Sequence, residues 1–131
     1  MDVRVREPEA ARPLVLVVED DAINRKLMVR AVESFGAFAR AAADGHEALE
    51  AAADRPYDLV LMDLGLPGLN GYEAARALRE RGYEGRIIAV TGMLDRGDLP
   101  GLQAQGFDGL MIKPVDMQDL QTCVDAVARA A

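Results

Sequence analysis

Cysteine is almost missing from this sequence, and long apolar runs are absent. The single cysteine, Cys123, has no second cysteine to pair with in the 131 residues, which excludes an internal disulfide and a cysteine metal site. No apolar run approaches the ~18 residues of a transmembrane helix. The charged segment 1–13 also lacks the apolar centre of a signal peptide. We therefore expect a cytoplasmic protein without a membrane partner.

Positive charge is scarce as well. The 15 lysine and arginine residues are outnumbered by 22 acidic residues, so the net charge is −7. Such a chain is repelled by nucleic acid phosphates and by anionic membranes, and we expect neither as a direct partner. The length suits one domain. Segment 1–13, which has two prolines and no periodicity, is predicted to be a flexible arm before a single domain at 14–131.

Four short apolar runs each end at a polar residue with reactive chemistry. The runs are Leu14–Val18, Leu59–Met62, Ile87–Val90 and Leu110–Ile112, and the polar residues that follow them are Glu19 with Asp20, Asp63, Thr91 and Lys113. Apolar runs of this length, separated by helical stretches, predict a parallel sheet buried on both faces. Parallel strands share one carboxyl edge, where open α/β sheets carry their sites. Three acids, a hydroxyl and an ammonium group should therefore converge into a site for a hard cation and a phosphoryl group.

Helical periodicity and capping signals fill the intervals between these strands. The predicted helices run from Asp20 or Asp21 to before Gly36, from Asp44 to about Ala53, from Asn70 to Gly82, from Asp98 to Gln105 and from Asp116 to about Arg129. In the first helix, the apolar residues Ile23, Leu27, Met28, Ala31, Val32 and Phe35 should share one face. Capping boxes are indicated by Asp44 with Glu47 and by Asn70 with Glu73. Segment 37–42 becomes the remaining strand because the alternation requires one. The prediction is an α/β fold with five strands and five helices.

A simpler interpretation exists for some of these acids. An acid directly after a strand can serve only as a helix cap, and this applies to Asp20 and Asp21. It does not suit Asp63, because the glycine- and proline-rich segment 65–71 follows and no helix begins there. The single histidine, His46, lies between Gly45 and Glu47 and is predicted to be a solvated surface side chain.

Five segments in order resemble the receiver domain of two-component response regulators. They are Val17-Val18-Glu19-Asp20, Asp44-Gly45-x-Glu47-Ala48-Leu49, Leu61-Met62-Asp63-x-x-x-Pro67-x-x-x-Gly71, Thr91-Gly92 and Lys113-Pro114. The details are most similar to receivers attached to hybrid sensor kinases and to single-domain receivers of phosphorelays. The resemblance implies a flavodoxin-like, doubly wound sheet with strand order 2-1-3-4-5.

The resemblance also implies a chemistry for Asp63. This carboxylate would take a phosphoryl group from the phosphohistidine of a histidine kinase or a histidine phosphotransfer protein. Asp20, Asp63 and the backbone carbonyl of Gly65 would bind Mg²⁺ directly, and Glu19 would bind it through water. The chain would catalyse only its own phosphorylation and dephosphorylation, so it is not expected to be an enzyme.

Two further roles follow from the same resemblance. Thr91 would donate its hydroxyl to the phosphoryl group, and Lys113 would pair with that group, with a cis peptide bond before Pro114. The output would pass to a downstream protein target by contact. In one respect the chain departs from the family, which usually carries Tyr or Phe three residues before the lysine. Leu110 stands there, so the aromatic switch is missing.

Three other classes of protein were weighed against this interpretation. A haloacid-dehalogenase-like phosphotransferase needs a second acid two residues after the nucleophile, where this chain has Gly65. A nucleotide-binding protein needs a phosphate-binding glycine loop, and no Gly-Lys-Ser/Thr occurs. A receiver-like interaction module that is not phosphorylated stays open as the alternative.

Overall fold

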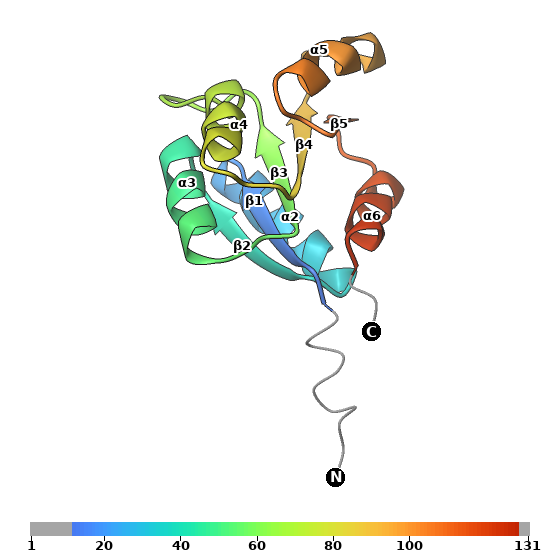
Figure 1. The fold of residues 1–131 in the computed structure, drawn as a ribbon. Helices are drawn as coiled ribbons and strands as arrows, with labels where there is room; N and C mark the ends of the chain where they lie inside the picture. The colour runs from blue at the N-terminus through green and yellow to red at the C-terminus, as the bar shows by residue number, and fades with distance from the viewer. Residues whose placement is uncertain (1–11, 129–131) are drawn as a thin grey trace.

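The computed structural model describes residues 12–128, which form one sheet between two layers of helices (Figure 1). The strands are β1 (Leu14–Val18), β2 (Phe38–Ala42), β3 (Leu59–Asp63), β4 (Arg86–Thr91) and β5 (Gly109–Ile112). The helices are α2 (Ala22–Ser34), α3 (Gly45–Asp54), α4 (Gly71–Glu80), the short 3-10 helix η2 (Arg96–Asp98), α5 (Leu99–Ala104) and α6 (Met117–Ala126). No helix within this part of the chain combines the length and apolar character needed to cross a membrane.

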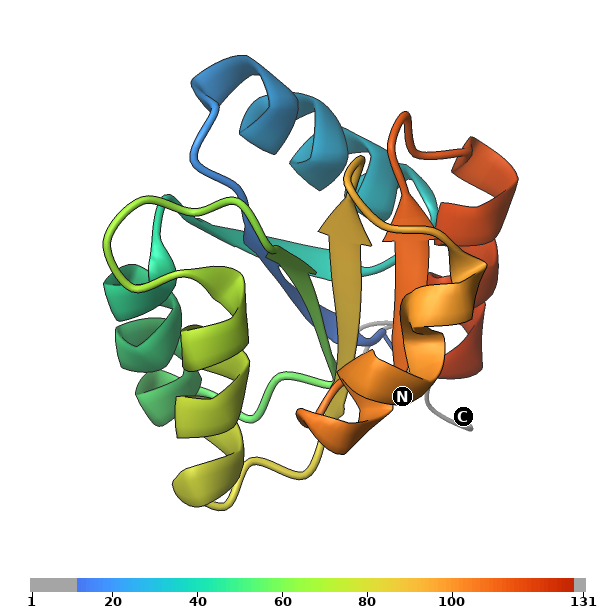
Figure 2. The same ribbon diagram turned by 90° about the horizontal axis from the view of Figure 1, so that it is seen from above.

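The sheet is parallel throughout, and its strand order is β2-β1-β3-β4-β5, as predicted. Successive side chains along each strand point to opposite faces of the sheet and pack into two separate cores. In β1, Leu16 and Val18 pack with α3, α4 and α5, whereas Val15 and Val17 pack with α2 and α6. Figure 2 shows these two helical layers on opposite sides of the sheet. The fold is therefore doubly wound.

The predicted amino-terminal arm falls largely on residues 1–11, which lie outside the described residues. Pro13, which the prediction included in the arm, is buried. Its carbonyl oxygen accepts a hydrogen bond from the Phe38 N–H at 2.9 Å. Pro13 is thus held against the first residue of β2.

Helix α2 is only partly covered along its apolar face. Val32 is buried and Met28 is partly buried, but Ile23 and Leu27 are 71% and 59% exposed. The predicted apolar face of the helix is therefore left uncovered at Ile23 and Leu27. The first two turns lie next to the carboxyl edge of the sheet, where no described element covers them. Helical periodicity predicts a shared face but not whether a neighbour covers its whole length.

Helix caps follow the predicted residues with one change of partner. Asp21, Asp44, Asn70 and Asp116 cap α2, α3, α4 and α6. Asn70 and Glu73 form the predicted capping box. At α3, the carboxylate of Glu47 instead accepts the N–H of Ala43, so that box is only half formed. The predicted end of the last helix, about Arg129, is also wrong, because α6 ends at Ala126.

Arg79 of α4 connects the loop after this helix to the loop before β5. Its guanidinium donates hydrogen bonds to the carbonyl oxygens of Gly106, Tyr83 and Gly85, at 2.7–2.9 Å. It also forms a 2.8 Å ion pair with Asp108. One side chain therefore satisfies acceptors in two segments, 83–85 and 106–108, that are more than twenty residues apart in the sequence.

Replacing Arg79 with Ala should lower the free energy of unfolding by about 2–3 kcal/mol, because hydrogen bonds to a charged group are lost and carbonyls are left without donors. Urea denaturation followed by circular dichroism measures this change. Arg76, an exposed residue of the same helix, supplies the control. Its replacement with Ala should change stability by less than about 0.5 kcal/mol. Equal effects of the two substitutions would contradict the role given to Arg79.

Candidate functional site

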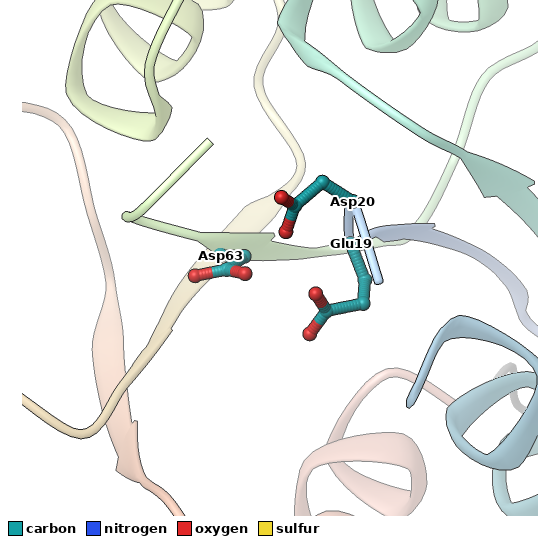
Figure 3. Close-up of side chains that lie close together, drawn as sticks. All are labelled: Glu19, Asp20 and Asp63. Carbon is teal, nitrogen blue, oxygen red and sulfur yellow. The ribbon is translucent and has the colours of Figure 1, made fainter. Parts of the chain in front are cut away.

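The candidate site lies at the carboxyl edge of the sheet, where the strands end in polar residues. Glu19 and Asp20 follow β1, Asp63 ends β3, Thr91 ends β4 and Lys113 follows β5. Glu19, Asp20 and Asp63 each offer a carboxylate oxygen within 4.8 Å of the others. Figure 3 shows these three side chains around a common space. The strand ends thus bring together acids that are more than forty residues apart in the sequence.

Asp63 is 7% exposed, and each of its carboxylate oxygens has a donor nearby. The Gly65 N–H donates to Oδ1 at 3.0 Å. The ammonium nitrogen of Lys113 lies 3.4 Å from Oδ2. A buried carboxylate held in this way keeps one orientation, because both its backbone neighbour and a cation fix it.

Lys113 lies between two buried acids. Its Nζ atom is 3.3 Å from Oε1 of Glu19 as well as close to Asp63. Burial by itself lowers the pKa of Lys113, but the nearby charges of Asp63 and Glu19 together raise it above its ordinary value. The lysine therefore stays protonated. The peptide bond between Lys113 and Pro114 is cis, as the family resemblance implied.

Glu19 is the acid whose protonation the surroundings change. Burial raises the pKa of Glu19. The hydrogen bond from the Asp21 N–H and the positive charge of Lys113 lower this pKa, whereas the negative charge of Asp63 raises it further. The net result is a pKa above the ordinary value of a glutamate. Crowding of like charges at this edge thus favours binding of either a proton or a cation.

Thr91 faces a hollow beside Asp63. Thr91 is 5% exposed. Its hydroxyl oxygen accepts a hydrogen bond from the Met93 N–H at 3.1 Å. The hollow has a volume of about 370 Å³ and is lined by Asp63, Leu64, Gly65, Tyr72, Thr91, Gly92, Met93, Leu94 and Lys113. A hydroxyl, a carboxylate and an ammonium group therefore border one small space, large enough for a tetrahedral anion.

Two residues have contacts at this site that the sequence does not indicate. Arg25 of α2 donates from Nη1 to the backbone carbonyls of Glu19 and Asp20, at 2.9 and 3.2 Å, and so holds the loop that carries both acids. Tyr72 lines the hollow and contacts Phe107 edge to face, with 6.1 Å between ring centroids. The position of Tyr72, directly after the site loop, is the one sequence signal that could have indicated it.

The fold and the site define a flavodoxin-like α/β protein with an acidic cluster at the carboxyl edge of its sheet. The family model of the response regulator receiver domain matches residues 15–125. The chain belongs to this receiver domain family of two-component systems. Receiver domains are in general signalling modules rather than enzymes.

Its relatives include response regulators and sensor kinases. Two-component system protein A of Emericella nidulans is 37% identical over 115 residues, covering 85% of this chain and 17% of that protein. Sensor histidine kinase GacS of Pseudomonas protegens is 32% identical, and the match covers 90% of this chain and 14% of that protein. Two-component response regulator PhoP of Pseudomonas aeruginosa is 32% identical, covering 88% and 51%. The chain thus spans only part of each of these proteins.

Solved structures share the same fold. The receiver domain of a sensor histidine kinase from Pseudomonas aeruginosa, which has a magnesium ion coordinated in its active site cleft, superposes with a TM-score of 0.79 at 31% identity. That match covers 88% of this chain and 97% of the other. A Francisella response regulator receiver domain gives a TM-score of 0.82 at 25% identity, covering 88% and 96%.

Proposed function

We propose that this chain is a phosphoacceptor receiver domain in which Asp63 takes a phosphoryl group from a phosphohistidine. The observation that carries the proposal is the placement of Asp63, which is buried among two further acids and one lysine beside a small hollow. A carboxylate oxygen attacks phosphorus, and a P–O bond forms. The P–N bond breaks, and its electron pair returns to the imidazole. The product is an acyl phosphate on Asp63.

The acid cluster fits a resident Mg²⁺ ion. Its donors are all oxygen atoms, they lie within 4.8 Å of one another, and the cluster carries more negative charge than Lys113 neutralises. Asp20, Asp63 and the carbonyl of Gly65 would hold the ion directly, and Glu19 would hold it through water. When bound, Mg²⁺ neutralises charge on the phosphoryl oxygens, which would otherwise be repelled by the carboxylates.

Lys113 and Thr91 are the remaining groups that would contact the phosphoryl group. Lys113 supplies a positive charge already aimed at the carboxylate of Asp63, so it can pair with a phosphoryl oxygen after transfer. Thr91 can turn its hydroxyl from the Met93 N–H, whose hydrogen bond it now accepts, and donate to the same group.

The direct test uses a small phosphodonor. Incubation of the chain with acetyl phosphate and Mg²⁺, followed by intact-mass measurement, should show a gain of one phosphoryl group per chain. Omission of Mg²⁺ should prevent it. A chain that gains no phosphoryl group under these conditions would instead be the non-phosphorylated interaction module.

Metal affinity should depend on the pKa of Glu19. A proton and the cation compete for the acid cluster, so Mg²⁺ affinity should fall as the pH falls through the raised pKa of Glu19. The decline should therefore begin at a higher pH than an ordinary glutamate would give. Isothermal titration calorimetry with Mg²⁺ over a pH series measures it. Glu19→Gln should shift the decline to lower pH, and an unchanged pH profile would contradict this assignment.

A helical, histidine-bearing protein is the proposed phosphoryl donor, and helix α2 is the proposed contact surface. Ile23 and Leu27 are exposed beside the site. Leu27 also borders a hollow of about 630 Å³, lined by Glu19, Asn24, Leu27, Met28, Ala31, Lys113, Pro114, Val115 and Met117. Arg25, Lys26 and Arg30 provide positive charge on the same helix. Apolar side chains supply buried area in such a contact, and charges orient it.

Charge reversal at Lys26 together with Leu27→Ser should slow phosphoryl transfer to this chain by about tenfold or more, because both area and charge are lost from the contact. Arg25 is left intact, since it holds the carbonyls of Glu19 and Asp20. The donor in this assay is a phosphorylated histidine phosphotransfer protein that phosphorylates the unmodified chain, and transfer is timed by quench flow. Labelling by acetyl phosphate should be unchanged. If phosphorylation by the protein donor and by acetyl phosphate slowed to the same degree, the result would argue against docking at α2.

The proposal extends to the setting of the protein. Its output would be contact with a downstream protein, with no direct nucleic acid or membrane partner, and its location would be the cytoplasm. The net charge of −7 supports the exclusion of polyanionic partners. The sensor kinases and response regulators among its relatives support the choice of a histidine kinase or phosphotransfer protein as donor.

A further inference from the structure

A group of arginines lies at the edge of the sheet opposite the acid cluster. Arg12 precedes β1 and Arg55 follows α3, so both are near the amino-terminal ends of the strands, whereas Arg40 lies in the middle of β2. With Leu14, Phe38, Ala39 and Tyr57 they line a hollow of about 490 Å³. None of the described residues that line it is acidic. Positive charge is thus concentrated here, in a chain whose net charge is −7.

These arginines are only weakly engaged within the described structure. The guanidinium of Arg12 lies over the ring of Phe38, 5.2 Å from its centroid. Arg40 pairs with Asp54 at 3.8 Å, with side chains 48% and 66% exposed, and such surface pairs contribute little. Phe38 itself is 40% exposed. A partner could therefore meet both the charges and the ring without breaking a strong contact.

The wall of the hollow includes a second unusual group. Tyr57 is 3% exposed, and its hydroxyl has no hydrogen-bond partner among the described residues. Buried hydroxyls without a partner are uncommon in folded proteins. Tyr57 thus joins the hollow to the hydrophobic core behind it.

Strand β2 lies at the edge of the sheet, labelled in Figure 1, and within residues 12–128 it pairs only with β1. The Phe38 N–H donates to Pro13, and the Ala42 carbonyl accepts from Glu19. In a parallel ladder, alternate residues bond to the same neighbour, so the backbone groups of Ala39 and Ala41 point away from β1. Ala39 also lines the arginine hollow. Backbone groups without a partner strand in the described part of the chain therefore adjoin positive side chains along one edge.

We propose that this edge binds an extended, acidic segment of a partner protein, which adds as a strand beside β2. Its backbone pairs with the outward N–H and C=O groups of Ala39 and Ala41. Its acidic side chains meet Arg12, Arg40 and Arg55. Backbone pairing supplies affinity in this mode of recognition, and side-chain complementarity supplies specificity. None of the residues that line this hollow lines the hollow beside Asp63, so the contact does not use the phosphorylation site.

The test uses the full chain, labelled with nitrogen-15, and a capped decapeptide of alternating glutamate and valine. The peptide should produce saturable shifts at the amides of Ala39 and Ala41 in heteronuclear correlation spectra, and these two amides should become protected from hydrogen exchange. Affinity should fall as salt is raised. A matched peptide of alternating lysine and valine should not bind.

Two double variants that change the net charge equally distinguish the effect of this surface from the effect of the overall charge. Arg40→Glu with Arg55→Glu should weaken binding by about tenfold or more. Arg76→Glu with Arg96→Glu, at exposed positions elsewhere, should leave binding nearly unchanged. Should the first variant fail to fold, Arg40→Gln with Arg55→Gln replaces it, with a smaller expected loss.

Three outcomes would overturn the proposal. No saturable binding would mean that the arginines only protect the edge strand from pairing. Binding without shifts at Ala39 and Ala41 would mean contact by charge alone, without strand addition. Equal weakening by both double variants would mean that the net charge of the chain, and not this surface, attracts the peptide.

Discussion

Asp63→Asn should abolish phosphorylation of this chain by acetyl phosphate. The amide has nearly the shape of the carboxylate and can still accept the Gly65 N–H, but it lacks the nucleophilic oxygen that forms the acyl phosphate. Intact-mass measurement after incubation with the donor and Mg²⁺ should show one added phosphoryl group on the unmodified chain and none on the variant. A variant that still gained one group would show that another residue is the nucleophile.

Asp20→Asn is the matched control for this experiment. It removes a proposed metal ligand and keeps the nucleophile, so phosphorylation should slow and should recover as Mg²⁺ is raised. Failure to recover would count against Asp20 as a ligand. Neither change should unfold the chain, since each removes one of the like charges that crowd this edge. Circular dichroism checks that both variants are folded.

The sheet could be predicted from the sequence because its strands are buried on both faces. Leu14–Val18 and Leu59–Asp63 alternate between two cores, so almost every position has to be apolar and the run is continuous. The edge strand β2 is different. Phe38–Ala42 is mostly exposed, shows no apolar run, and was placed only by the alternation of elements. Local pattern thus predicts the centre of the sheet better than its edge.

The site could be predicted in part for a similar reason. Glu19, Asp63, Thr91 and Lys113 are fixed by where strands end, and strand ends can be located in the sequence. Arg25 could not be found in this way, because its role depends on the path of the loop after β1 and on the direction of a long side chain. Whether Ile23 and Leu27 are covered likewise depends on which neighbours reach them. Contacts set by tertiary packing leave no periodic signal.

Gly71 shows how closely the fold and the site are joined. It is the first residue of α4 and is buried against the end of β3. A Cβ atom at this position would clash with the carbonyl oxygen of Asp63 and would lie 2.8 Å from the Cα of Leu64. These are backbone atoms, so they cannot move aside as a flexible side chain does. The helix would have to withdraw from the strand that carries the proposed nucleophile.

Gly71→Ala should therefore lower the free energy of unfolding by at least about 2 kcal/mol, because overpacking against backbone strains the native state. It should also slow labelling of the folded fraction by acetyl phosphate, because Asp63 is displaced. Urea denaturation and timed intact-mass measurement give the two values.

Gly101→Ala is the matched control for Gly71→Ala. Gly101 lies in α5, and a Cβ atom there would meet nothing within 4 Å. Alanine at this helical position should stabilise the chain by about 0.5–1 kcal/mol, since it reduces the freedom of the unfolded chain and favours the helix. Labelling should be unchanged. If both substitutions proved harmless, the first turn of α4 could move away from β3 without disturbing Asp63, and Gly71 would not link the fold to the site.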